Sequence, residues 1–166
     1  GDLGRAENVI SLIDVLISQR LYPAALAQSQ ELLENKALTD AQRARGMLLR
    51  AQALLGAGRP GDVPPLLQEL RIAPGGQAGE AQINLLLGQA YVRMGGRHAA
   101  EGLGLLRGVA ADATAGALAV SAQFELARFE LSQAATPQQI QTMAKWLSAN
   151  PQHELAADGR RELVEA

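Results

Sequence analysis

One position that usually holds a small residue recurs along the chain, each time where a helical stretch is expected to restart. Ala25, Val63, Ala100 and a less regular position near Ile140 are separated by about 38, 37 and 40 residues. A nearly fixed period of this length is typical of repeat proteins, in which one unit cannot bury its own apolar face and must stack on the next. The period therefore indicates an array of similar units.

The composition predicts that these units are helical. Ala, Leu and Gly dominate, β-branched residues are sparse, and no stretch alternates with the period of two that marks a strand. Turn residues separate the helical stretches. We therefore expect an all-α chain with helices over about residues 5–19, 24–35, 39–55, a short stretch after 62, 80–94, 99–110, 115–133, 136–150 and a final one at the C-terminus.

Three of these helices begin with residues that favour capping. Thr39-Asp40 is expected to cap the third helix, and Asp62 the fourth. At Thr136, Pro137 occupies the first helical position and Gln139 follows three residues after the threonine. This spacing predicts a capping box, in which each side chain binds the backbone N–H of the other residue.

The stretch from Leu87 to Ala100 contains Leu87-Gly88, then Tyr91, then a turn and a small residue. This pattern resembles the middle of a tetratricopeptide repeat. The resemblance implies a right-handed α-α superhelix of about four helix pairs plus a C-terminal helix, as one domain over 1–166. Its repeats would cover about 6–39, 44–76, 81–113 and 119–151, and the terminal helix 152–166 would be either a cap or a truncated repeat. A generic α-solenoid or helical bundle is the alternative fold.

The bulk properties predict no nucleic-acid or membrane partner. The net charge is −2, the isoelectric point is about 5.7, and aromatic residues make up only 3% of the chain. The most apolar run, Val9–Ile17, is too short to cross a bilayer and contains Asp14. Arg outnumbers Lys by 13 to 2, which suggests a bacterial gene, and the start at Gly1 suggests part of a longer protein. These features are compatible with both the cytosol and the periplasm as the cellular compartment.

No motif predicts catalysis, a metal or a cofactor. The chain has no cysteine, which excludes thiol nucleophiles and thiolate metal sites. The sequence from Gly56 to Gly61 has the form G-x-G-x-x-G but follows a helical stretch rather than a strand, so it is interpreted as a turn between helices. His98 and His153 are expected at the surface, and Phe124 and Phe129 in the core. We therefore predict that the chain is not an enzyme.

The resemblance implies instead a concave groove that binds a protein or peptide. Carried over by position, its polar lining would be Asp14, Arg45, Gln52, Gln82, Gln89, Arg93 and Arg128. Apolar lining positions would be Ile17, Leu48, Leu55, Leu85 and Val92. Arg45 and Arg93 are expected to contribute most of the affinity for an acidic partner.

The leading hypothesis from the sequence is a non-catalytic scaffold within a larger bacterial protein. The alternative is a structural spacer or self-association module of a cell-envelope assembly, such as a polysaccharide export machine. A binding module should have a groove with paired polar and apolar sites. A spacer should have a featureless groove and ends that associate.

Overall fold

The computed structural model describes residues 1–166, except for the side chains of residues 2, 3, 77 and 78. Over the described backbone it contains nine α-helices and no strand, which confirms the all-α prediction. The helices are α1 (Asp2–Ser18), α2 (Tyr22–Glu34), α3 (Asp40–Gly56), α4 (Val63–Ile72), α5 (Glu80–Met94), α6 (Ala99–Ala111), α7 (Ala117–Gln133), α8 (Pro137–Ala149) and α9 (Ala156–Glu165). Short 3-10 turns cover Pro60–Asp62, Gly76–Gly79 and Gly96–His98.

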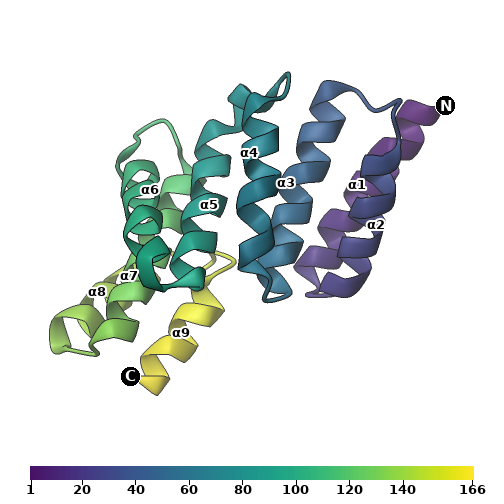
Figure 1. Cartoon of the computed structure of the whole chain (residues 1–166). Helices are drawn as coiled ribbons and strands as arrows, with labels where there is room; N and C mark the ends of the chain where they lie inside the picture. Colours follow the sequence, from purple (N-terminus) through teal and green to yellow (C-terminus); the bar gives the residue numbers. More distant parts are fainter.

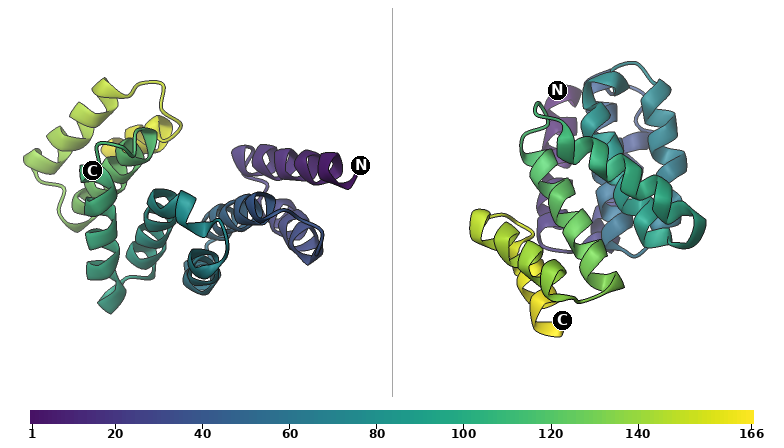
Figure 2. Two further views of the ribbon diagram at one scale, coloured as in Figure 1. Left: turned by 90° about the horizontal axis from the view of Figure 1, so that it is seen from above. Right: turned by 90° about the vertical axis from the view of Figure 1, so that its left-hand side faces the viewer.

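The helices form an extended array rather than a closed bundle. Each helix packs against the next one along the chain, and α1, α3, α5, α7 and α9 also pack against one another in that order. The odd-numbered helices therefore form one continuous layer. Figure 1 shows the first six helices side by side, with α7 to α9 turned away from that direction. Figure 2 shows from above that the array is curved; a right-handed superhelix stays a prediction.

The core follows the same stepwise order. One apolar cluster joins α1, α2 and α3, and the next joins α3, α4 and α5. Two further clusters extend the core through α6 and α7 to α9. Each helix pair thus buries its apolar side chains against the following pair, as expected when single units cannot cover their own faces.

A close, glycine-lined helix contact lies between α5 and α6. A Cβ atom added at Gly88 would lie 2.8 Å from the side chain of Leu106, and one added at Gly102 would lie 2.8 Å from the Gly88 carbonyl oxygen. Gly102 is buried, whereas Ala100 is exposed. The small residue that makes the close approach in this unit is therefore Gly102, two residues after the position expected from the sequence.

Local hydrogen bonds explain which helix starts were predicted correctly. Thr39 caps α3 as expected, and Gln42 completes a capping box: the Gln42 N–H donates to Thr39 Oγ1, and the Thr39 N–H donates to Gln42 Oε1, both at 3.1 Å. Asp62 makes no cap hydrogen bond, because its carboxylate binds Arg59 at 2.8 Å. The capping box predicted at Thr136 is wrong: Thr136 makes no side-chain cap bond.

Candidate functional site

A large hollow lies over the layer of odd-numbered helices. Its volume is about 1150 Å³, and its lining comes from α3, α5, α7 and α9 together with the ends of α1, α2 and α6. On α5, the lining residues Gln82, Leu85, Gln89 and Val92 recur every three or four residues, which places them on one helix face. The hollow therefore follows from the packing of α3, α5 and α7 in one layer.

Five of the seven polar groove residues expected from the sequence line this hollow. They are Gln52, Gln82, Gln89, Arg93 and Arg128. Of the apolar groove positions, Ile17, Leu55, Leu85 and Val92 also line it. Leu48 instead packs against the core cluster of α3, α4 and α5.

The other two polar residues, Asp14 and Arg45, lie outside the hollow. Arg45 is seven residues before Gln52 on α3, which is about 10 Å along the helix axis. Its guanidinium contacts the Glu7 carboxylate of α1 at 3.0 Å. Arg45 therefore lies on the same face of α3 as Gln52 but about two turns beyond the hollow, which covers only part of the length of α3.

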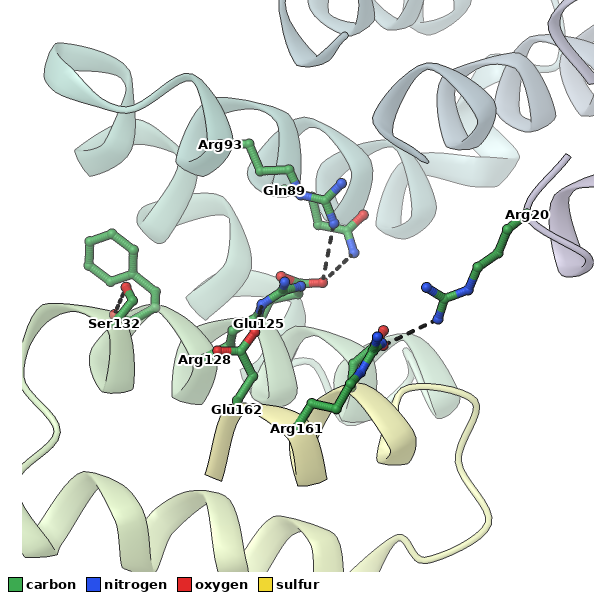
Figure 3. Close-up of polar contacts among 10 residues, drawn as sticks. Arg20, Gln89, Arg93, Glu125, Arg128, Ser132, Arg161 and Glu162 are labelled. Carbon is green, nitrogen blue, oxygen red and sulfur yellow. Dashed lines mark hydrogen bonds and ion pairs between the residues drawn. The ribbon is translucent and has the colours of Figure 1, made fainter. Parts of the chain in front are cut away.

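Gln89 and Arg93 are already bound to groups of the same chain. The Gln89 Nε2 atom donates to Glu125 Oε1 at 3.0 Å, and the Arg93 guanidinium lies 3.9 Å from that oxygen (Figure 3). Arg93 also donates to the Leu55 carbonyl oxygen at 3.2 Å. The Glu125 side chain is only 7% exposed, and a buried carboxylate is costly unless such donors surround it. These two residues thus join α3, α5 and α7.

Ion pairs also connect the far side of the hollow to α9. Arg128 of α7 donates to Glu162 at 3.0 Å. Arg20, in the turn after α1, reaches the Asp158 carboxylate at 3.2 Å, and Arg161 binds the same oxygen. Figure 3 shows Arg20 extended across the gap toward α9. The turn after α1 therefore meets the C-terminal helix although 138 residues separate the two partners.

The sequence analysis missed the acidic part of the lining. Glu125, Glu154, Asp158 and Glu162 all line the hollow. They lie on α7, on α9 and just before α9, in the part of the chain where the resemblance defines no reliable register. The spacing of Asp158 and Glu162 places both on one helix face and was the available signal. Phe129, expected in the core, is half-buried and also lines the hollow, whereas Phe124 is fully buried.

The lining includes two half-buried amides, Gln52 and Gln82, besides the exposed amide of Gln133. Both side chains are half-buried, and neither makes a hydrogen bond or ion pair with another described residue. Each amide offers two N–H donors and one carbonyl acceptor. Leu55 lies one turn from Gln52, and Leu85 lies one turn from Gln82. This part of the hollow therefore presents amides with no partner among the described residues beside apolar side chains.

The hollow also contains a serine close to a histidine. Ser121 Oγ lies 3.3 Å from His153 Nε2, and His153 Nδ1 accepts the backbone N–H of Leu155 at 3.1 Å. The neutral ring therefore carries its proton on Nε2 and donates it to Ser121. A general base needs a free lone pair at that nitrogen, so this arrangement does not activate the serine.

Both histidines have aromatic neighbours rather than open surroundings. The His153 ring packs edge-on against the ring of Trp146, with centroids 5.2 Å apart. The His98 ring stacks on Tyr91, with centroids 5.8 Å apart. Both side chains are half-buried, so each histidine lies at the surface with one side packed against an aromatic ring.

Neither a metal site nor a membrane-spanning helix in the described part of the chain, nor a similar known protein, was found to indicate a function. Among the described residues, no group of three or more acidic, histidine or cysteine side chains is arranged to hold a metal ion. Within the same residues, no helix combines the length and apolar character needed to cross a bilayer. No protein-family model, curated protein or solved structure matches this chain. The geometry of the hollow is therefore the main guide to function.

Proposed function

We propose that the protein is a non-catalytic scaffold whose hollow binds an extended segment of a partner protein. The observation that carries this proposal is the pair of free, half-buried amides, Gln52 and Gln82, beside apolar side chains in a hollow of about 1150 Å³. An extended peptide exposes backbone N–H and C=O groups that match such amides, while its side chains fit the apolar positions. The resemblance of Leu87-Gly88 and Tyr91 to a tetratricopeptide repeat supports the same function.

The structure of the lining changes which residues are proposed to bind. Arg93 and Arg128 are engaged with Glu125 and Glu162, so recognition of an acidic partner by these arginines would first require breaking internal contacts. The free amides need no such exchange. We therefore assign the binding role to Gln52 and Gln82, and a supporting role to Gln89, Arg93 and Arg128.

The test is selection of binders from a library of random peptides displayed on phage, followed by affinity measurements with purified variants. The double variant Gln52→Ala/Gln82→Ala removes both amides while keeping the hollow open. We expect it to weaken the selected peptides roughly tenfold, because each lost hydrogen bond contributes about 0.5–1.5 kcal/mol. The variant Gln82→Arg should also weaken binding by filling the hollow.

The matched control is Gln68→Arg. Gln68 is exposed on α4, which does not line the hollow. Its replacement adds the same side chain outside the proposed site, and we expect no change in affinity. Peptides that bind all variants equally, or a selection that enriches no peptide, would contradict the proposal.

A further inference from the structure

Helix packing in this array connects near neighbours only. The odd-numbered helices pack in the order α1, α3, α5, α7 and α9, and among the described residues neither α1 nor α2 packs extensively on α9. When each unit contacts only its neighbours, the curvature of an array is the sum of small rotations between successive units. A direct contact between distant units therefore acts on the curvature of the whole array.

One ion pair makes such a contact across the hollow. The Arg20 guanidinium, in the turn after α1, lies 3.2 Å from the Asp158 carboxylate of α9. Figure 3 shows the arginine side chain extended over the gap between the two elements. Both residues line the hollow of about 1150 Å³. The pair therefore joins two sides of the hollow that helix packing leaves unconnected.

The backbone of Arg20 has a conformation that favours glycine. Its φ is +60°, and no other described residue except glycine has a positive φ. The Leu21 N–H donates to the Leu16 carbonyl oxygen at 2.8 Å, and the Arg20 N–H donates to the Ile17 carbonyl oxygen at 2.9 Å. These two bonds form a Schellman motif, in which the residue at the position of Arg20 is usually glycine. What the arginine adds to this turn is therefore its side chain.

Asp158 can release Arg20 without losing its only partner. Arg161, three residues further along α9, binds the same carboxylate oxygen. The Arg20 side chain is 60% exposed and that of Asp158 is 19% exposed. An ion pair of this exposure changes an equilibrium by no more than about fivefold, and salt weakens it further. The contact between Arg20 and Asp158 can therefore open and close without disrupting the packing of the helices.

We propose that Arg20 and Asp158 form a clasp that holds the array curved around a segment bound in the hollow. When the clasp is closed, the turn after α1 and α9 bound the hollow on one side. When it opens, the array straightens, the hollow widens and the segment dissociates more readily. The inference rests on the proposed function for what the clasp retains, and it adds a control on release.

The first test measures the distance between α2 and α9 without any peptide. The chain has no cysteine, so spin labels attached to Ala24→Cys/Ala157→Cys are the only two. Both positions are exposed, and neither lines the hollow. Pulsed electron-electron double resonance then gives the distribution of distances between the labels, at about 0.05 M and about 1 M NaCl, which differ strongly in charge screening.

The variants separate the clasp from general effects of charge. We expect Arg20→Gln to move population from the short distance to a longer one by up to about fivefold. Arg20→Lys keeps the charge and should retain most of the short distance. Wild type at high salt should resemble Arg20→Gln, which should itself respond little to salt. The matched control is Arg59→Gln, which removes the charge of an exposed arginine whose ion pair with Asp62 is local, and it should match wild type.

The second test is the rate at which peptides selected on the hollow dissociate. We expect this rate to rise by up to about fivefold in Arg20→Gln and to stay unchanged in Arg59→Gln. Equal dissociation from Arg20→Gln and wild type would overturn the role of the clasp in release.

The distances decide the clasp independently of peptide binding. Identical distance distributions for wild type and Arg20→Gln at both salt concentrations would overturn the clasp, and so would an equal shift in Arg59→Gln. Peptide binding with unchanged distances would leave the proposed function standing and remove the clasp. A selection that enriches no peptide would contradict the proposed function, while the distances would still show whether the ion pair sets the curvature.

Discussion

The substitution Gly102→Ala tests the contact between α5 and α6 most directly. The added Cβ atom would lie 2.8 Å from the Gly88 carbonyl oxygen and 2.8 Å from the Val92 backbone nitrogen. Both are main-chain atoms of α5, so neither can rotate away as a side chain would. The two helices must therefore separate locally or shift along one another.

The matched control is Gly104→Ala on the same helix. A Cβ atom added at Gly104 has no neighbouring atom within 4 Å. Replacing a helical glycine by alanine gains about 0.8–1 kcal/mol of helix propensity, and this gain applies to both positions. Overpacking of a tight contact costs about 1–3 kcal/mol. The difference between the two variants therefore isolates the packing cost.

The assay is urea unfolding followed by circular dichroism at the helical signal. We expect Gly104→Ala to raise the urea midpoint above that of wild type. The free energy of unfolding of Gly102→Ala should be about 1–3 kcal/mol lower than that of Gly104→Ala, which corresponds to a midpoint difference of the order of 1 M urea. If Gly102→Ala matched or exceeded Gly104→Ala, the helices would not approach as closely as the structure shows. The argument from the paired glycines would then be refuted.

Three further predictions concern other contacts. Gly88→Leu should cost about 2–4 kcal/mol in urea unfolding, because the longer side chain collides with α6; an unchanged midpoint would contradict the contact. Hydrogen bonds from the hydroxyl and N–H of Thr114 lower the pKa of Asp112, so Thr114→Val should raise that pKa in an NMR titration while Thr114→Ser should not. The hydrogen bonds to ionised Asp112 stabilise the folded state at pH values above the pKa of Asp112 in the unfolded chain. This stabilisation is lost as the pH falls through the lowered pKa of Asp112 in the folded state. Arg45→Ala should cost less than about 1 kcal/mol and leave peptide affinity unchanged, since its ion pair with Glu7 is exposed and outside the hollow; weaker peptide binding would return Arg45 to the site.

Local sequence signals predicted the helices well because they act over a few residues. The bounds of α5, Glu80–Met94, agree with the prediction, since Gly95 and Gly96 stop the helix whatever surrounds it. Thr39 caps α3 by a bond to a residue three positions away. The capping box predicted at Thr136 did not form although its spacing was correct. The side-chain oxygen Oε1 of Gln139 is buried instead of accepting the N–H of Thr136 at the helix start.

The residues that line the groove were predictable only in part, because helical spacing is local whereas contacts between helices are not. Helical spacing places Gln52, Gln82 and Gln89 on the inner faces of their helices, and all three line the hollow. Spacing cannot show which charges meet between distant helices. Arg45 contacts Glu7 because α1 and α3 pack directly on each other, whereas Arg20 contacts Asp158 because the curved array brings the turn after α1 near α9.

The sequence by itself therefore determined the helical class, the positions of most turns and the inner faces of the middle helices, since these depend on residues within one or two turns of each other. The tertiary structure alone decided which polar groups remain free. Gln89 and Arg93 are occupied by the buried carboxylate of Glu125, while Gln52 and Gln82 have no partner among the side chains that the structure describes. That difference arises because a buried charge must collect donors from whichever helices pack around it.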